Sequence, residues 1–287
     1  MRPPVSIIGH LTRRSRRGGS PSPRAPERPP SAKVLRYAGS VFGRAQRQAR
    51  KIVMARRVVA AARLLRARAR LAIGVRPLSV VRGFDRGTPI HRHYVAQFLA
   101  EFADDVRGHC LEFQGDTYLR TFGRERVTRR DILHQTADNP RATLVADLTQ
   151  PNDLPSDTFD CIVCTYVLHH IYESDRAVAE LHRILKPGGV LLVAVPMVSM
   201  DEPGHGELWR FTPGGLQAML TRAFGADHVL VRPYGNSLIA AGQIRGLVTH
   251  EFTRGEREVH DPRFAIVVCA RAVKHSDGAP PAPVHKS

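Results

Sequence analysis

Three acidic residues follow short apolar runs in the first half of the sequence: Glu112, Asp131 and Asp147. If these runs are strands of an open parallel sheet, their carboxyl ends meet at one edge, where such sheets bind ligands. Glu112 and Asp131 are 19 residues apart, close to the ~20 that separate the glycine-rich turn from the ribose-binding acid in dinucleotide sites. Each acid alone is typical of a solvated loop. In this order they favour a nucleoside ligand, with Asp131 at the ribose and Asp147 at the adenine.

Three histidines are candidate catalytic residues. His169 and His170 follow a fourth apolar run, and His205 stands in an acid-rich stretch. A neutral imidazole beside the ligand edge can accept the proton of a hydroxyl nucleophile. His169 and His170 can equally be helix-packing or capping residues, and the sequence leaves both roles open.

Cys161 and Cys164 form a C-x-x-C pair that invites a metal or redox interpretation. The surrounding run, 159–167, has the character of a buried strand, in which residues i and i+3 point to opposite faces. The two thiols would then not converge on one ion. We therefore expect reduced structural cysteines and no metal site.

These residues need a scaffold, and the sequence supplies alternating β-like and helix-like runs. Strands are expected over 108–113, 125–128 with an end at Asp131, 142–146, 158–165, 190–195, 228–232 and 265–270. Helices are expected over 91–106, 174–185 and 213–224, the last with Thr212 as its N-cap. Such alternation predicts right-handed crossovers. The fold class is therefore α/β, a Rossmann-like, doubly wound, mostly parallel seven-stranded sheet.

The positive charge is concentrated before this domain. Residues 1–82 carry 21 Lys and Arg and one acid, whereas the remaining residues carry 22 bases and 25 acids. Composition predicts a disordered basic segment (1–32), a basic helical arm and linker (33–82), a folded domain (83–274) and a disordered tail (275–287). Because the domain is nearly neutral, nucleic acid is not favoured as its partner.

The arm has a weak apolar stripe from Val41 to Ala62 between its arginines. Such a helix, within 33–73, can lie on an anionic membrane surface. The alternative is a solvated helix whose Arg content reflects only codon bias. No apolar run reaches the ~18–20 residues that span a bilayer, and the first thirty residues lack a secretory apolar region. We expect a cytoplasmic protein, peripheral to the membrane if the arm binds there.

The stretch 157–196 is the most specific in the chain. It reads DTFDCIVCTYVLHHIYE, then a helix, then LHRILKPGGVLLVAVP. It resembles the class I S-adenosylmethionine-dependent methyltransferases, of the type 11 kind, and the resemblance covers residues 83–274. A subgroup associated with polysaccharide biosynthesis is similar in four further segments: FDRGTPI (84–90), DTY (116–118), FG (122–123) and WRFT (209–212).

The resemblance implies S-adenosyl-L-methionine as the cofactor. In that subgroup, Asp131, Asp147 and the loop through Leu148 and Thr149 correspond to cofactor contacts. We expect Glu112, Gly115, Asp116 and Thr165 to contact the cofactor as well. Trp209, Arg210 and Phe211 in the WRFT segment are the candidate acceptor residues, because the two aromatic rings can stack on a sugar or an aromatic acceptor. Trp209 can equally be a lid or core residue. One departure stands in the first turn, since Gln114 occupies the place of the family's first glycine.

The sequence thus predicts methyl transfer to a small molecule or glycan by in-line displacement. One alternative is a nucleic-acid methyltransferase that uses the basic arm. Another, given Gln114, is a binding protein that keeps the fold without the chemistry. A nicotinamide dehydrogenase is disfavoured because no G-x-G-x-x-G follows the first strand. The acceptor and the oligomeric state are left open.

Overall fold

The computed structural model describes residues 48–66, 69, 74–201, 204 and 206–275. The chain divides into two compact units, residues 1–58 and 59–287. Residues 48–66 are helical, within the basic arm where a helix is expected. In the part of the chain that the structure describes, no helix is both long and apolar enough to cross a membrane. The segments 1–32 and 276–287, expected to be disordered, and the candidate His205 lie outside the described residues.

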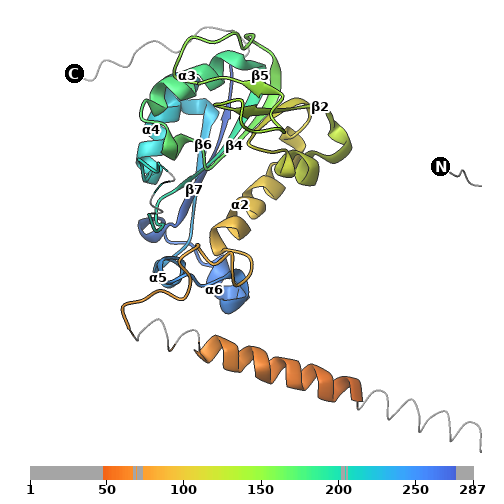
Figure 1. The fold of residues 1–287 in the computed structure, drawn as a ribbon, viewed down its shortest axis with the longest axis vertical. Coiled ribbons are helices and arrows are strands. Elements are labelled where there is room, and N and C mark those ends of the chain that lie inside the picture. The colour runs from red at the N-terminus through yellow and green to blue at the C-terminus, as the bar shows by residue number, and fades with distance from the viewer. Residues whose placement is uncertain (1–47, 67–68, 70–73, 202–203, 205, 276–287) are drawn as a thin grey trace, which may run out of the picture. The chain divides into compact units, whose positions relative to one another are not determined.

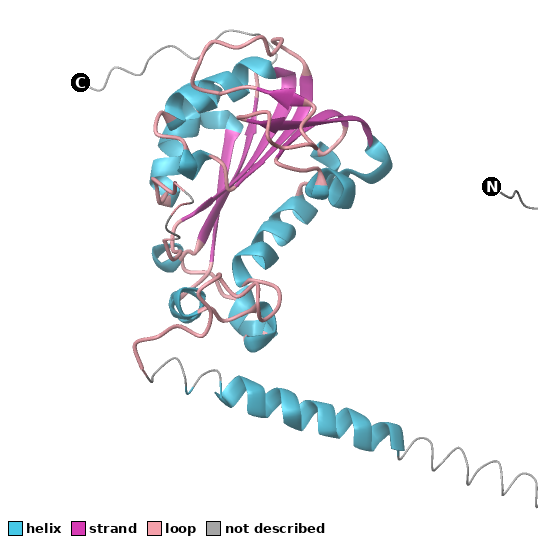
Figure 2. Cartoon of the chain, in the orientation of Figure 1, coloured by secondary structure: helices cyan, strands magenta, loops and turns pink. Residues whose placement is uncertain are grey.

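A seven-stranded sheet forms the centre of the second unit (Figures 1 and 2). Its strands lie in the order β3-β2-β1-β4-β5-β7-β6. The pairings among β1 to β5 are parallel, and β7 is antiparallel to both β5 and β6. This confirms the predicted doubly wound, mostly parallel α/β fold. The strands are β1 Gly108–Phe113, β2 Val127–His134, β3 Leu144–Val145, β4 Phe159–Thr165, β5 Leu185–Pro196, β6 Val229–Tyr234 and β7 Val267–Val273.

One face of the sheet is covered by α2 (Ile90–Glu101) and α5 (Ser237–Arg245). Tyr94, Phe98 and Ile239 from these helices are fully buried in the core on this side. Each such side chain contributes roughly 1.5–3 kcal/mol when it leaves water. This face is therefore held by the helix that enters the domain and by one near its end.

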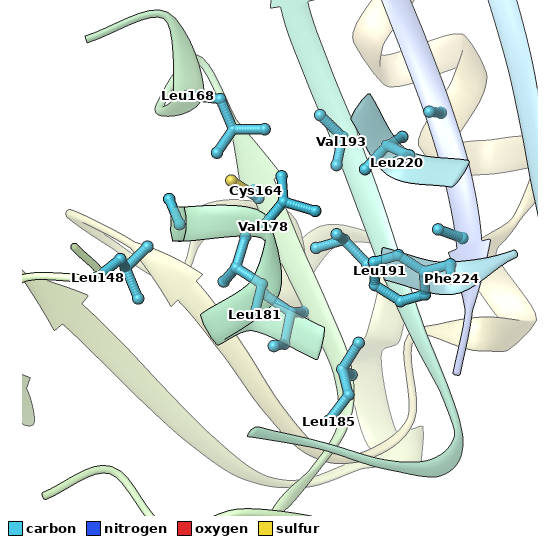
Figure 3. Packing of buried hydrophobic residues seen from close by; sticks show 14 of the residues in the cluster. Leu148, Cys164, Leu168, Val178, Leu181, Leu185, Leu191, Val193, Leu220 and Phe224 are labelled. Carbon is cyan, nitrogen blue, oxygen red and sulfur yellow. The ribbon is translucent and has the colours of Figure 1, made fainter. Parts of the chain in front are cut away.

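The opposite face is covered by α3 (Ser174–Ile184) and α4 (Pro213–Phe224), as Figures 2 and 3 show. Leu181 and Phe224 are buried there against the central strands. The predicted N-cap of α4 is confirmed, because the Thr212 hydroxyl accepts a hydrogen bond from the Gly215 N–H (3.1 Å). The remaining helical elements are α6 Arg254–Glu258 and the short turns Ala103–Asp105, Leu119–Gly123, Arg124–Arg126, Leu168–His170, Ala226–His228, Thr249–Glu251 and Pro262–Phe264.

The second strand is longer than the sequence predicts. It continues to His134, past Asp131 where it was expected to end. The cause is pairing, since Leu133 and His134 lie opposite Leu144 and Val145 of β3. Asp131 therefore lies inside β2, and the strand's carboxyl end, where the sequence placed Asp131, is three residues further on at His134.

Other predicted bounds differ by smaller amounts. The fifth strand begins at Leu185, before the Lys-Pro-Gly-Gly segment, because Leu185 pairs with Phe159. The helix expected over 91–106 ends at Glu101. The last two strands are displaced by one to three residues toward the C-terminus, since their ends are fixed by pairing with each other.

The C-x-x-C pair behaves as its place in a strand requires. Cys161 is buried in the core on the α2 side, and Cys164 in the core on the α3 side. Opposite faces of one sheet separate the two thiols, so they do not form a joint site.

The folded unit also includes residues that the sequence placed in the linker. The Leu78 N–H donates to the Arg245 carbonyl (2.8 Å) at the end of α5. Ser79 is 3% exposed, and its hydroxyl accepts from the Gly83 N–H (2.8 Å). These contacts bring residues 78–82 into the packing of the domain, upstream of residue 83.

Candidate functional site

Glu112, near the carboxyl end of β1, holds the turn that follows. Its buried carboxyl group accepts hydrogen bonds from the N–H groups of Leu119 (2.9 Å) and Tyr118 (3.2 Å). Burial raises the pKa of Glu112 to about 7, and the neighbouring Asp116 carboxylate acts in the same direction. Glu112 therefore fixes the turn that follows β1 by accepting hydrogen bonds from its backbone.

Gln114 turns the chain directly after β1. Its φ of 62° lies in the left-handed region, which costs a residue other than glycine about 1–2 kcal/mol. The Asn139 side chain donates to the Gln114 carbonyl (3.1 Å) and helps to hold this conformation. The turn therefore keeps a backbone that suits glycine, although the sequence departs from glycine here.

Asp116 closes the turn through its arginine partners. It is 3% exposed, and its two oxygens accept from Arg120 (2.5 Å) and Arg141 (2.7 Å). The Arg141 guanidinium also lies beside Gly115, where an added Cβ would come within 3.3 Å of it. Asp116 is therefore committed to intramolecular ion pairs that fix the first turn.

Asp131 is also engaged within the protein. Oδ1 accepts from the Thr143 hydroxyl (2.7 Å), and Oδ2 lies 2.6 Å from His109 Nε2 and 3.2 Å from Arg129 Nε. These partners outweigh burial and lower the pKa of Asp131. The sequence places this acid at a strand end facing a ligand; the structure places it within β2 with both oxygens bonded.

Asp147 follows β3, as the sequence predicts. Oδ1 accepts from the Thr149 N–H (2.8 Å) and hydroxyl (2.7 Å), and the backbone bond is the main cause of its lowered pKa. Oδ2 accepts from Gln135 (3.0 Å), which follows β2. Leu148 is 6% exposed in the core. Gln135 and Asp147 thus form an accessible polar pair across the ends of two strands.

A cavity of about 180 Å³ lies at the carboxyl ends of β1, β4 and β5. The strand order reverses between β1 and β4, and open α/β sheets bind ligands at such a point. Gln114 lines the cavity from the turn after β1, and Tyr166, His169 and His170 line it from the segment after β4. Thr165, the last residue of β4, is half-buried and does not line it.

His169 is a buried, neutral imidazole. It is 2% exposed, and its ring centroid lies 3.9 Å from that of His170. Burial lowers the pKa of His169 to about 3, and His170, Arg210 and Arg82 add to this by electrostatic repulsion. The ring therefore carries no charge at neutral pH.

Glu207 is the carboxylate of this cavity. Oε1 accepts from Arg82 (2.5 Å), Oε2 accepts from Arg210 (2.5 Å), and His169 Nε2 lies 3.6 Å from Oε1. His169, His170 and Glu207 offer ligand atoms within 4.8 Å of one another. Two guanidinium groups occupy the Glu207 oxygens and would repel a metal ion, so we assign no metal to this cluster.

Trp209 and Phe211, predicted to stack on the acceptor, do not line this cavity but a separate hollow. They border an open groove at the first turns of α3 and α4, together with Tyr172. The Trp209 indole N–H donates to the Ile171 carbonyl (2.9 Å), and its ring lies 5.7 Å from that of Tyr172. Of the predicted acceptor side chains, that of Arg210 donates to the cavity carboxylate Glu207 (2.5 Å).

The sequence reasoning missed several residues that line the cavity, among them Arg82, Phe84, His91, Arg92 and Gln243. The first four precede the first strand, and the fifth belongs to α5. The FDRGTPI segment and the run HRH at 91–93 were the available signals, because charged and aromatic residues cluster there. Burial lowers the pKa of His91 to about 3, and its Nδ1 lies 3.1 Å from the Gln243 amide nitrogen.

Residues 96–193 match the model of a methyltransferase domain, which is about a third of the chain. Two curated relatives are similar over short segments, and both are ubiquinone/menaquinone biosynthesis C-methyltransferases. The one from Marinomonas sp. (strain MWYL1) is 49% identical over 39 residues, 14% of this chain and 16% of that protein. The one from Escherichia coli (strain K12 / DH10B) is 46% identical over 86 residues, which are 30% of this chain and 28% of that protein. The chain thus spans less than a third of either relative.

Solved structures of methyltransferases are also similar. The N-methyltransferase NodS from Bradyrhizobium japonicum WM9, in complex with S-adenosyl-L-homocysteine, is 14% identical with a TM-score of 0.44, over 66% of this chain and 89% of that one. The 1,6-didemethyltoxoflavin-N1-methyltransferase of Burkholderia thailandensis is 17% identical with a TM-score of 0.39, over 65% of this chain and 78% of that one.

Proposed function

We propose that residues 78–274 form an S-adenosylmethionine-dependent methyltransferase. The observation that carries this proposal is the place of the cavity. It lies at the carboxyl ends of β1, β4 and β5, where the strand order reverses, and the stretch that matches a methyltransferase domain contains β1 and β4 and most of β5. The names of the two C-methyltransferases that match short segments support the same activity.

The polar groups at this edge fit a nucleoside donor. Gln135 and Asp147 present an amide and a carboxylate at the ends of β2 and β3, suited to ribose hydroxyls and an adenine amino group. Leu148, which follows Asp147, is 6% exposed and belongs to the core, so it supports this edge from within the domain. Asp131 is 5% exposed and its oxygens are bonded within the protein, whereas Asp147 is half-buried and its partner Gln135 is exposed. We therefore infer that Asp131 positions this edge through Thr143 rather than holding the ribose itself.

The donor, when bound, supplies a methyl group already activated by its sulfonium, so the chain's task is mainly to orient the acceptor for in-line displacement. A hydroxyl acceptor must also lose a proton. His169 and His170, whose ring centroids lie 3.9 Å apart, are the two candidates to take that proton. The His169 ring is neutral, but its pKa of about 3 makes it a weak base, which leaves His170 as the first candidate. Both residues line the cavity.

The acceptor class that we propose is a small molecule or glycan, in line with the subgroup associated with polysaccharide biosynthesis. Trp209 is 40% exposed and Tyr172 is 74% exposed in the open groove. Exposed aromatic faces of this kind suit a sugar ring. Residues 83–287 carry slightly more acids than bases, which disfavours a nucleic-acid acceptor. Greater methyl incorporation into RNA or DNA than into a lipid-linked glycan fraction would reverse this choice.

A methyltransferase must first bind its donor. Calorimetric titration of the full-length protein with S-adenosylmethionine and S-adenosylhomocysteine tests this binding. We expect both to bind. Asp147→Ala should weaken binding by about 1–3 kcal/mol, the cost of leaving a polar group unpaired. Asp131→Ala should lower the free energy of unfolding more than it lowers affinity. Absence of binding by the parent protein would remove the proposal.

We also propose that the basic arm contacts an anionic membrane from the cytoplasmic side. The helix over 48–66 carries six cations and no acid: Arg50, Lys51, Arg56, Arg57, Arg63 and Arg66. Each cation near an anionic leaflet contributes ~1 kcal/mol, and the attraction fades as salt screens it. Co-sedimentation with anionic and neutral vesicles at low salt is the test. Equal pelleting with both kinds would show that the arm does not bind membranes in this way.

A further inference from the structure

The cavity contains a guanidinium that has no acid beside it. Arg82, on the same wall, pairs with Glu207 at 2.5 Å. In contrast, no described carboxylate lies within 4.0 Å of Arg92, which is half-buried and lines the cavity. A partly buried charge without a counter-ion is costly. Arg92 therefore marks the place in the cavity where an anionic group would be stabilised.

Three neighbours hold the Arg92 side chain in position. Its Nη1 donates to the Tyr118 hydroxyl (2.7 Å), and its guanidinium carbon lies 5.2 Å from the ring centroid of Tyr166 and 6.0 Å from that of Phe84. None of these groups neutralises the charge. A guanidinium has five N–H donors in a planar fork, so this anchored side chain keeps donors for a planar, bidentate acceptor.

The same cavity is lined by residues whose buried polar atoms lack partners. In the described part of the chain, the Tyr166 hydroxyl, His169 Nδ1 and Gln243 Oε1 are buried without a hydrogen bond. Each such atom costs roughly 1–3 kcal/mol. The Gln243 oxygen can only accept, whereas the hydroxyl can donate or accept. A ligand that satisfies these atoms and Arg92 would have a hydrogen-bond donor beside an anionic group.

We propose that this cavity binds a carboxylate with a neighbouring amine or hydroxyl, and that Arg92 pairs with the carboxylate. The proposal rests on the proposed function, because two molecules in that reaction can supply such a group. One is the methyl donor, whose methionyl end carries a carboxylate and an amine. The other is an acidic sugar acceptor, whose carboxylate lies near a ring hydroxyl.

The size of the cavity and the donor set favour a carboxylate over a larger anion. A volume of about 180 Å³ is below the roughly 300–1,000 Å³ of whole-ligand pockets, so it admits one end of a molecule. The only unpaired cation on its wall is the single fork of Arg92, among the residues that the structure describes. That fork matches the two oxygens of one carboxylate.

The first experiment separates the donor's carboxylate from the rest of the donor. The full-length parent, Arg92→Gln and Arg92→Lys are titrated with S-adenosylhomocysteine and with 5′-methylthioadenosine, which lacks the amino-acid end. If the donor is the source, Arg92→Gln weakens S-adenosylhomocysteine by about 10- to 100-fold and leaves 5′-methylthioadenosine unchanged. Arg92→Lys should fall between, because it keeps the charge and loses the fork. Arg254→Gln, on exposed α6, is the control.

The second experiment tests the acceptor as the source. D-glucuronate and uncharged D-glucose are titrated onto the parent and Arg92→Gln, with and without saturating S-adenosylhomocysteine. Binding of D-glucuronate alone, lost in Arg92→Gln, assigns the carboxylate to the acceptor. If Arg92→Gln changes neither S-adenosylhomocysteine nor D-glucuronate binding, the inference is wrong. Failure of the parent to bind either nucleoside refutes the methyltransferase proposal instead, and the D-glucuronate titration without nucleoside then decides the inference.

Discussion

Nε2 of His169 lies 3.6 Å from Oε1 of Glu207, and each side chain is less than 5% exposed. The backbone reinforces this contact, because the Leu208 and Trp209 N–H groups donate to the His169 carbonyl (2.8 and 3.1 Å). Glu207 also accepts from Arg82, which precedes α2. The pair therefore joins the segment before α2, the turn after β4 and the segment 207–210 around the cavity. Glu207 also offsets part of the positive charge of Arg82 and Arg210.

Removing the Glu207 charge should destabilise the domain. Glu207→Gln leaves the guanidinium groups of Arg82 and Arg210 without their shared anion. Their side chains are 19% and 28% exposed, so water compensates in part and we expect a loss of about 2–4 kcal/mol in the free energy of unfolding. Urea denaturation measures it. Glu258→Gln, which breaks the exposed pair with Arg254, should change stability by less than about 1 kcal/mol. Equal effects in the two variants would contradict this account.

His169 should not titrate in the physiological range. Burial, followed by the repulsion of His170, Arg210 and Arg82, lowers its pKa to about 3, so the ring should remain neutral from pH 5 to pH 8. Histidine-selective NMR across this range, with the His169 signal assigned by its loss in His169→Asn, checks the prediction. A midpoint near pH 6.5, as in an exposed histidine, would show that the ring is solvated or paired with Glu207 as an imidazolium.

Glu112 should make stability fall as pH rises. Its folded pKa is about 7, above the unfolded value of 4.5, so the folded state binds more protons between these values. The resulting stabilisation is present below pH 4.5 and is lost as pH rises through 7. The difference in unfolding free energy between the parent and Glu112→Gln should therefore change by about 1–3 kcal/mol from pH 4.5 to pH 7.5. A difference that stays constant with pH would exclude the raised pKa. Glu258→Gln controls for the loss of one carboxylate.

Gly242 should not tolerate a side chain. A Cβ there would lie 2.4 Å from the Phe252 ring, which is 4% exposed and packed in the core. We expect Gly242→Ala to cost about 1–3 kcal/mol and to disturb the adjacent Gln243 in the cavity wall. Gly255, in α6, has no atom within 4 Å of an added Cβ, so Gly255→Ala should be neutral or stabilising. Thermal unfolding of both variants compares them, and similar midpoints would disprove the close approach.

The sequence by itself determines the fold class and much of the ligand edge. Strand and helix patterns are local, with periods of 2.0 and 3.6 residues, and they place the central strands and α4 close to their observed bounds. The Thr212 cap is readable for the same reason, since its partner is three residues away. His169 and His170 follow β4 as expected.

Only the tertiary structure decides which side chains meet at that edge. Arg82 and Glu207 are 125 positions apart, and His91 and Gln243 are 152 apart, so no local pattern relates them. Asp131 looks like a ligand-facing acid in the sequence, yet β3 pairing extends its strand and Thr143 and His109 occupy its oxygens. Whether a charged group is paired, buried or open to a ligand depends on packing around the sheet, because its free energy is set by neighbours in space rather than along the chain.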